Sequence, residues 1–391
     1  MAEATLALRK ACKTASSCEG FGGLLVKGLA IKIFSRRKTI VELLSSVQRN
    51  TLFSTLCFAH FGGRRSTNFG LKAAIVFVSL PNEDAPHDVS VEVRLITAVK
   101  TPYQADGKID LEAFDKLVEH QIANGVEGLI IGGTTGEGHL LSLEERIGLV
   151  SHSKACPLRK GRQHRQQPHR RSPDLTAAGM DAALLINPYY GKTSDSGIVM
   201  HLEAALKFGP AFIYNVPGRT GQDIKPEVIM KIKDHPHFIG VKVCLESVTQ
   251  ELSDQGICCW SGNDDQMHQS RHKCGAVGVI SVTSNVVPGL VKRLMTQEDE
   301  ELNAKLGPLY KWLFTDPNPI GVNTMLMMLG AAKPIFRLPY TFVPRDRRLA
   351  GLELVKSIGL EWGPFRRPGG GRGRRKRKFL FSPEVGNLPN H

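Results

Sequence analysis

From about residue 91 to residue 296, short aliphatic runs alternate with amphipathic segments. Uninterrupted aliphatic runs are typical of strands buried on both faces, and apolar residues every three or four positions are typical of helices. The expected strands lie at 93–99, 128–133, 182–187, 211–215, 238–243, 257–261 and 276–282, and the expected helices at 110–124, 142–155, 195–207, 224–234, 264–273 and 286–296. Repeated strand–helix units predict a parallel sheet.

Seven strands are one short of the eight that close an α/β barrel. The missing strand belongs between 142–155 and 182–187, but residues 157–174 contain three prolines and show no alternation of apolar and polar positions. A buried central strand does not have such a sequence, because proline cannot donate to the hydrogen-bond ladder. The pattern therefore predicts a (β/α)8 TIM barrel whose third strand is disrupted.

The flanking segments divide the chain into four parts. Residues 1–90 are rich in Ser, Thr, Arg and Lys and lack an apolar span of membrane length, which predicts an organelle transit peptide. The barrel at 91–296 is followed by a small C-terminal helical extension at 297–362, with helices expected at 300–314, 319–329 and 346–358. Residues 363–391 are interpreted as a basic disordered tail.

The formal net charge of +14 comes from three basic segments, at 1–80, 154–174 and 363–379, while the remaining residues have a net negative charge. An acidic body argues against nucleic acid or a membrane surface as partner. The eight cysteines have no Cys-x-x-Cys spacing, so neither a zinc site nor a disulfide framework is expected.

Lys242 lies within the aliphatic run Phe238-Ile-Gly-Val-Lys-Val-Cys244 and is expected to be buried. Burial lowers the pKa of an amine, and a neutral amine forms Schiff bases with carbonyl compounds. A lysine that extends its amine from a strand end to solvent is the alternative. Two further motifs favour the reactive amine, because Thr134-Thr135 and Tyr214 with Arg219 also follow aliphatic runs.

Over about residues 93–360, apart from 157–174, the chain resembles the plant-type dihydrodipicolinate synthase family. The motifs are Gly-Gly-Thr-Thr-Gly-Glu-Gly at 132–138, Ile-Asn-Pro-Tyr-Tyr-Gly-Lys-Thr-Ser at 186–194, Tyr-Asn-Val-Pro-Gly-Arg-Thr-Gly at 214–221, Gly-Val-Lys at 240–242, Trp-Ser-Gly-Asn-Asp-Asp at 260–265 and Gly-Val-Ile-Ser-Val-Thr-Ser-Asn at 278–285. The resemblance implies a (β/α)8 barrel that condenses pyruvate with L-aspartate semialdehyde, the first committed step towards diaminopimelate and lysine. It implies no metal or organic cofactor, a chloroplast location, and a homodimer or homotetramer.

The resemblance also implies a role for each matching residue. Lys242 would form the imine with pyruvate, and Tyr214 would transfer protons together with Thr134 and Tyr190. Tyr190 would reach the neighbouring subunit's site, so activity would require the dimer.

The substrates' carboxylates have their own expected partners. Thr135 would bind that of pyruvate, and Arg219 would bind that of the semialdehyde as a bidentate donor. Backbone groups of Gly262 and Ile280 would line the same mouth.

Lysine, the family's feedback inhibitor, is expected to act weakly here. Tyr189, Gly138 and His139 match its site, but Leu143 and Arg146 stand where relatives have Trp and His. The Asn and Glu that complete the site are absent from 157–174.

Two departures concern the barrel. Val243 replaces the usual Glu, and it should point away from Lys242 because side chains alternate along a strand. For 157–174 we hypothesise a reading-frame error: codons for Gly-Asn-Thr-Gly-Ser-Asn-Pro-Thr-Gly-Glu-Ala, read two nucleotides later, give Gln-His-Arg-Gln-Gln-Pro-His-Arg-Arg-Ser, the sequence of 163–172. A transcript that truly encodes this segment in frame would contradict the hypothesis.

Two alternatives remain open at this point. The chain could be another pyruvate-dependent class I aldolase or lyase of the same superfamily, such as an N-acetylneuraminate lyase. It could also be an inactive, misfolded product, because the loss of a central strand exposes two sheet edges.

Overall fold

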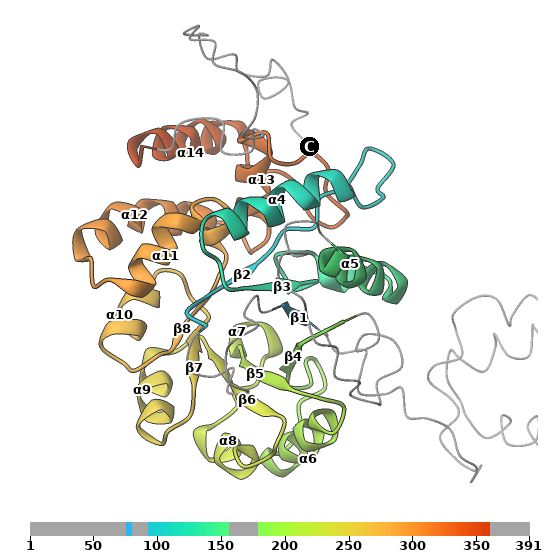
Figure 1. Cartoon of the computed structure of the whole chain (residues 1–391), viewed down its shortest axis with the longest axis vertical. Helices are drawn as coiled ribbons and strands as arrows, with labels where there is room; N and C mark the ends of the chain where they lie inside the picture. Colours follow the sequence, from blue (N-terminus) through green and yellow to red (C-terminus); the bar gives the residue numbers. More distant parts are fainter. Residues whose placement is uncertain (1–75, 80–92, 156–178, 360–391) are drawn as a thin grey trace, which may run out of the picture. The chain divides into compact units, whose positions relative to one another are not determined.

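Eight strands form a closed barrel in the computed structural model, which describes residues 76–79, 93–155 and 179–359 (Figure 1). Around the barrel the strands follow the order β1-β3-β2-β8-β7-β6-β5-β4. Their bounds are β1 Val76–Ser79, β2 Leu95–Ala98, β3 Gly128–Ile131, β4 Ala182–Ile186, β5 Ala211–Asn215, β6 Phe238–Val243, β7 Cys259–Ser261 and β8 Gly278–Ser281. All seven strands that the sequence predicts are therefore present, with ends that differ by a few residues.

Strand β1 closes the barrel between β3 and β4. It pairs antiparallel with both, and Val78 lies opposite Ile130 on one side and Ala182 on the other. The other pairs, from β3 through β2, β8, β7, β6 and β5 to β4, are parallel. Strand β1 belongs to the range that the sequence assigns to the leader. The predicted disruption of the third strand concerns residues 157–174, which lie outside the described residues.

Helices surround the strands where the periodicity predicts them (Figure 1). They are α4 Leu111–Ala123, α5 Leu143–Ala155, α6 Asp195–Leu206, α8 Pro226–Ile232, α10 Met267–His272 and α11 Pro288–Thr296. The sequence prediction missed α9, Glu246–Asp254, because this nine-residue helix is mostly polar and buries only Thr249 and Leu252. Helices α12 Glu300–Leu313, α13 Ile320–Met328 and α14 Arg345–Ser357 pack on one another beyond the barrel. Within the described parts of the chain, no helix has the length and apolar character needed to span a bilayer.

Two predicted helix starts have the expected caps. The Ser142 hydroxyl accepts a hydrogen bond from the Glu145 amide at 3.1 Å, and the Glu145 carboxylate accepts one from the Ser142 amide at 2.9 Å. This reciprocal pair is a capping box. Asp110 caps α4 by accepting from the Ala113 amide at 3.2 Å.

Alternation along the strands separates an inner core from an outer one. The inner cluster fills the barrel and includes Ile96, Ile130, Leu184, Phe212, Trp260 and Ile280. The Trp260 indole packs edge-to-face on Phe212, and its N–H donates to the Val93 carbonyl at 2.7 Å. Val243 belongs to the outer cluster beneath the helices, which confirms that it points away from Lys242.

Candidate active site

Lys242 and Tyr214 lie side by side on neighbouring strands. Tyr214 of β5 is the register partner of Lys242 of β6, and the Lys242 Nζ atom is 4.3 Å from the centroid of the tyrosine ring. Both residues are near the C-terminal ends of their strands, where α/β barrels place their active sites. The structure therefore brings together the two residues at the centre of the predicted chemistry.

Burial changes the chemistry of the Lys242 amine. The residue is 6% exposed, and this burial lowers the pKa of its amine below the ordinary value. The Cys244 thiol and the Asp264 carboxyl act in the opposite direction, and the Arg219 charge lowers the pKa further. The net effect favours the neutral amine, which is the nucleophilic form.

Asp264 is buried beside this centre. One carboxylate oxygen accepts hydrogen bonds from the Thr283 amide at 2.8 Å, the Val282 amide at 3.0 Å and the Thr283 hydroxyl at 3.0 Å. Burial still raises the pKa of the Asp264 carboxyl. These bonds hold the turn that follows β8, the strand that contains Ile280.

Asn318 links the two residues expected to bind carboxylates. Its side-chain amide donates to the Thr135 hydroxyl oxygen at 3.1 Å, and its backbone carbonyl accepts from the Arg219 guanidinium at 3.3 Å. Because the Thr135 oxygen accepts from Asn318, its own proton is free for an anion. Thr135 is buried and Arg219 is exposed, so Thr135 lies deeper in the mouth than Arg219.

A second buried lysine supports the turn that contains Thr134 and Thr135. The Lys100 Nζ atom lies 2.5 Å from the Glu137 carboxylate, and Asn323 donates to the same carboxylate oxygen at 2.9 Å. Glu137 has a positive φ of 54°, a conformation that residues other than glycine adopt rarely. The ion pair with Lys100 and the hydrogen bond from Asn323 hold Glu137 in this strained conformation.

Gly262, which directly follows β7, borders the Lys242 side chain. A Cβ atom on Gly262 would lie 3.0 Å from the Lys242 Cε atom, so only glycine leaves room for the lysine. Ile280 is fully buried and belongs to the inner core. Gly262 therefore lies against the Lys242 side chain, and the role of Ile280 stays a prediction.

Thr134 and Tyr190 are the residues expected to share a proton relay with Tyr214. Among the described residues, no hydrogen bond joins either one to the Tyr214 hydroxyl. Tyr190 is 98% exposed, with φ of 66°, in the loop after β4. The Cys244 thiol lies close to this centre, because a Cβ atom on Gly262 would lie 2.5 Å from its Sγ atom and 3.0 Å from the Lys242 Cε atom.

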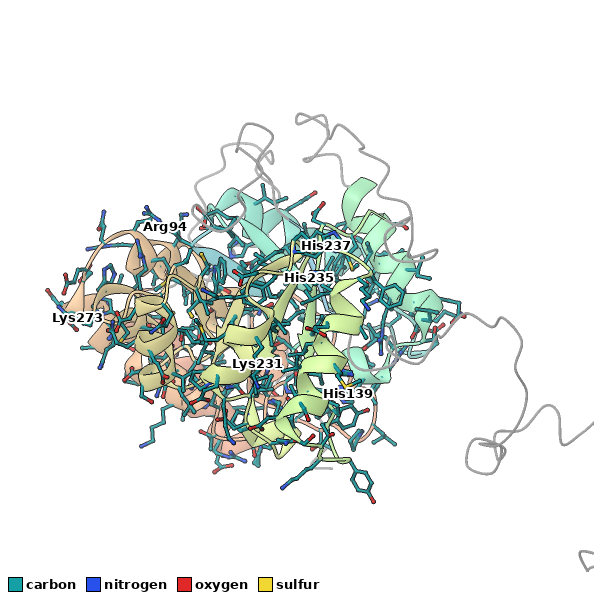
Figure 2. All side chains as sticks on the ribbon, turned by 90° about the horizontal axis from the view of Figure 1, so that it is seen from below. Arg94, His139, Lys231, His235, His237 and Lys273 are labelled. Carbon is teal, nitrogen blue, oxygen red and sulfur yellow. The ribbon has the colours of Figure 1, made fainter. Side chains whose placement is uncertain are left out.

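The predicted lysine-site residues lie beside the turn after β3. The Arg146 guanidinium donates to the Gly138 carbonyl at 2.6 Å, and the His139 ring contacts the Tyr340 hydroxyl at 2.8 Å. Tyr189 is exposed and interacts electrostatically with Arg146. Figure 2 shows His139 well apart from His235 and His237, which precede β6 at the opposite end of the strands.

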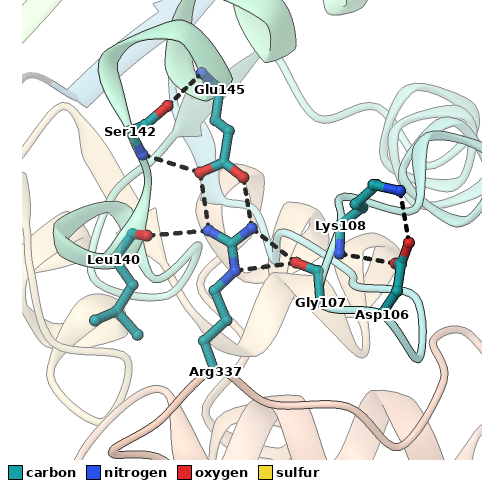
Figure 3. A network of polar contacts seen from close by, with 7 residues as sticks. All are labelled: Asp106, Gly107, Lys108, Leu140, Ser142, Glu145 and Arg337. Atoms are coloured by element: carbon teal, nitrogen blue, oxygen red, sulfur yellow. Dashed lines mark hydrogen bonds and ion pairs between the residues drawn. The ribbon is translucent and has the colours of Figure 1, made fainter.

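Arg337 connects three segments near the turn after β3 (Figure 3). Its guanidinium binds both Glu145 oxygens, at 2.5 and 2.8 Å, and also donates to the carbonyls of Gly107 and Leu140. The segment before α14 is therefore joined to the start of α5 and to the loop before α4.

Sequence reasoning missed Cys244, Asn318 and the Lys100–Glu137 pair. Cys244 was detectable, because it lies two residues beyond Lys242 and so faces the same side of the strand. Asn318 is 183 residues from Thr135, and no local sequence pattern links the two residues. In the ranges 93–155 and 179–359, no group of three or more His, Cys, Asp or Glu side chains is placed to hold a metal ion.

Comparisons with known proteins agree with this geometry. The model of the dihydrodipicolinate synthetase family matches residues 92–358. The chain is 51% identical over 278 residues to 4-hydroxy-tetrahydrodipicolinate synthase 1, chloroplastic, of Arabidopsis thaliana, covering 69% of this chain and 76% of that protein. It is 50% identical over 289 residues to the chloroplastic synthase of Zea mays, covering 72% and 76%.

Solved structures are similar over the same part of the chain. Dihydrodipicolinate synthase from Aquifex aeolicus matches with a TM-score of 0.62 and 27% identity, covering 68% of this chain and 98% of that one. The Acinetobacter baumannii enzyme, solved with pyruvate, matches with a TM-score of 0.60 and 28% identity, covering 68% and 98%. The chain therefore belongs to the dihydrodipicolinate synthetase family.

Proposed function

We propose that this protein is a 4-hydroxy-tetrahydrodipicolinate synthase, a lyase that condenses pyruvate with L-aspartate 4-semialdehyde in lysine biosynthesis. The observation that carries the proposal is the buried Lys242 amine beside Tyr214, at the end of the barrel where Thr135 and Arg219 also lie. Plant relatives at about half identity are named for the same reaction.

The reaction begins at Lys242. Its neutral amine attacks the ketone carbon of pyruvate, and loss of water gives the imine. Loss of a proton from the methyl carbon then gives the enamine, whose carbon attacks the aldehyde of the second substrate. Burial of Lys242 assists the first step, because the free amine rather than the ammonium attacks.

Thr135 and Arg219 account for the two carboxylates. The Thr135 hydroxyl, whose oxygen already accepts from Asn318, directs its proton to the pyruvate carboxylate. Arg219 is exposed at the mouth, where its planar guanidinium suits the semialdehyde carboxylate. Backbone groups of Gly262 and Ile280 complete the pyruvate pocket. An N-acetylneuraminate lyase activity has no observation in its favour.

Proton transfer is assigned to Tyr214, with Thr134 and Tyr190 as its relay. Tyr190 is almost fully exposed in the single chain, as expected for a residue that serves a partner subunit. We therefore propose a homodimer, or a homotetramer built from two such dimers, in which each subunit of a dimer completes the other's relay.

Lysine is proposed as a weak inhibitor. Arg146 places a guanidinium against Gly138, and this positive charge opposes a cationic effector at the residues Tyr189, Gly138 and His139. Inhibition should appear only at millimolar lysine in a steady-state assay, and inhibition at micromolar lysine would contradict the assignment.

The protein is chloroplastic, in agreement with its relatives of about 50% identity. We assign residues 1–90 to a transit leader, 91–296 to the barrel, 297–362 to the helical extension and 363–391 to a tail. Because β1 lies at 76–79, the mature chain should begin upstream of it. We also retain the proposal that the third strand of the family barrel is disrupted in this chain.

Borohydride trapping tests the proposed function. The purified chain is incubated with pyruvate and sodium borohydride, which reduces an imine to a stable secondary amine, and the adduct is mapped by peptide mass spectrometry. We expect labelling at Lys242, and the matched control Lys116→Met, which removes an exposed lysine of α4, should leave this labelling in place. A folded sample without label at Lys242 would exclude the mechanism.

A further inference from the structure

Arg348 is a buried charged side chain with donors that lack acceptors. The residue belongs to α14 and is 3% exposed, and its Nε and Nη1 atoms are enclosed without a hydrogen-bond partner. A buried guanidinium with unpaired N–H groups lowers stability, because water no longer solvates the charge. Arg348 therefore offers buried donors to a negative group.

The scaffold fixes the first turn of α14. The Arg347 guanidinium donates to the Asp316 carboxylate at 2.7 and 3.4 Å, and the Arg347 carbonyl accepts from the Trp312 indole at 2.8 Å. Just before the helix, the Val343 amide donates to the Thr324 hydroxyl at 3.3 Å. The position of this turn is therefore set by α12, α13 and the loop between them, and the charge of Arg347 is already paired.

Helix geometry directs the Arg348 side chain toward the start of α14. Arg348 shares a face with Leu352 and Val355, which are also buried, because residues three or four positions apart lie on one side of a helix. A helical side chain lies over the turn that precedes its own Cα atom. The Arg348 guanidinium is therefore expected on the buried side of the N-terminal turn.

The N-terminal turn of α14 has amide groups without acceptors in the helix. The Arg348 amide donates to the Pro344 carbonyl at 2.9 Å, and the amides of 345–347 precede this first bond of the helix. Pro344 provides no side-chain cap, and Asp346, the acid of this turn, is exposed. Free amides and the helix dipole favour a negative group at this end.

We propose that Arg348 and the N-terminal amides of α14 form a binding site for a phosphate group. The site combines the donors of one guanidinium with backbone amides, and a tetrahedral dianion has enough oxygens to accept from both. A carboxylate has only two oxygens and one charge. The site belongs to the helical extension and goes beyond the proposed catalytic function, and its occupancy stabilises the packing of α14 on α12 and α13.

Isothermal titration calorimetry of the full chain with inorganic phosphate tests the proposal. The wild type should bind phosphate, and Arg348→Met should weaken this binding by at least about tenfold, because it removes charge-assisted donors. The matched control Lys356→Met removes a positive charge from the other end of α14 and should bind like the wild type. Acetate at the same ionic strength should bind far more weakly than phosphate.

Thermal unfolding separates a phosphate site from a purely structural arginine. Phosphate at about a hundred times its Kd should raise the wild-type Tm by roughly 5 °C, and it should raise the Tm of Arg348→Met much less. In phosphate-free buffer, Arg348→Met should be at least as stable as the wild type, because it removes an unpaired buried cation.

Four outcomes would overturn the inference. The first, which needs no variant, is a wild type that does not bind phosphate. The second is equal phosphate binding by the wild type and Arg348→Met, and the third is acetate binding as tight as that of phosphate. The fourth is an Arg348→Met protein that is destabilised equally with and without phosphate, which would make the arginine structural.

Discussion

Two lysines are buried in this barrel, and their surroundings differ. Lys100 is 2% exposed and has the Glu137 carboxylate 2.5 Å from its amine. Lys242 is 6% exposed, and no carboxylate of the described residues is within ion-pair distance. Burial lowers the pKa of both amines, but only Lys100 has a directly bonded anion that opposes the effect. The first lysine is therefore structural and the second is available for chemistry.

The difference predicts opposite effects of the same substitution. Lys242→Met should raise the free energy of unfolding at pH 7 by about 1–3 kcal/mol, because it removes an unpaired buried amine. Lys100→Met should lower the free energy of unfolding by about 3–5 kcal/mol, because it leaves Glu137 buried without its cation. Urea unfolding of both variants measures the change, and a destabilised Lys242→Met protein would contradict the assignment.

The pH dependence of the Lys242→Met effect follows from linkage. The folded-state pKa of Lys242 is below the unfolded value of 10.5, so between these values the unfolded state binds more protons. Stability of the wild type therefore rises with pH through this window. The gain in the free energy of unfolding from Lys242→Met should be complete below the folded-state pKa of Lys242. It should vanish near pH 10.5.

For single residues, the sequence predicts those that follow strands. It misses those whose contacts join segments far apart in the sequence. Lys242, Tyr214 and Thr135 are predicted as site residues because each lies at or just after the end of an aliphatic run. Asn318 lies between two helices of the C-terminal region, and its bonds to Thr135 and Arg219 depend on how those helices pack on the barrel. No local pattern encodes that packing.

At the level of the elements, the segment between α13 and α14 is joined to the barrel by the Arg337 side chain. Arg337 is mostly buried, stacks 4.5 Å from the Tyr103 ring centroid, and joins Glu145 to two loop carbonyls (Figure 3). A lysine can offer only a point charge to these acceptors, whereas arginine is a planar fork with five donors.

Arg337→Lys should therefore lower the free energy of unfolding by about 1–3 kcal/mol. Thermal and urea unfolding measure the change. The matched control, Lys116→Gln, removes one partner of an exposed pair with Glu112 on α4 and should have an effect below about 0.5 kcal/mol. Equal stabilities of Arg337→Lys and wild type would show that the network contributes little.

Element prediction succeeds where the apolar pattern is strong. Strands β5 and β6 are predicted to the residue, because most of their positions are apolar and turn or helix residues adjoin both ends. Helix α9 is missed because its buried face consists of Thr249 and Leu252 alone. Strand β1 is missed because its four residues lie in a stretch whose composition resembles a leader.

For the molecule as a whole, β1 determines whether the barrel is closed. Three of its residues pair with β3 and three with β4. A chain that begins at residue 67 keeps this strand, whereas a chain that begins at residue 91 exposes two sheet edges. The shorter chain should be less stable, by on the order of 3–5 kcal/mol, from the lost hydrogen bonds. Urea unfolding compares the two chains, and equal stability would show that β1 is dispensable.

The proposed dimer makes one further prediction that concerns the assembly. Lys242→Met removes the imine-forming amine, and Tyr190→Phe removes the relay hydroxyl, so each variant alone should be strongly impaired. If Tyr190 serves the partner's site, a mixed dimer contains one site with both groups intact and one site with neither. Unfolding and refolding the two variants together should then restore activity, to about a quarter of the wild-type value for random mixing of dimers.

Mixing without refolding is the control, because exchange of subunits is needed to form the mixed dimer. Trapping with pyruvate and borohydride should label only the Tyr190→Phe subunit, which retains Lys242. If Tyr190 acted within its own chain, every site in the mixture would lack one group and activity would stay at the level of the separate variants. Recovery of activity would place Tyr190 across the interface. If native mass spectrometry shows mixed dimers but no activity is recovered, the relay lies within one subunit.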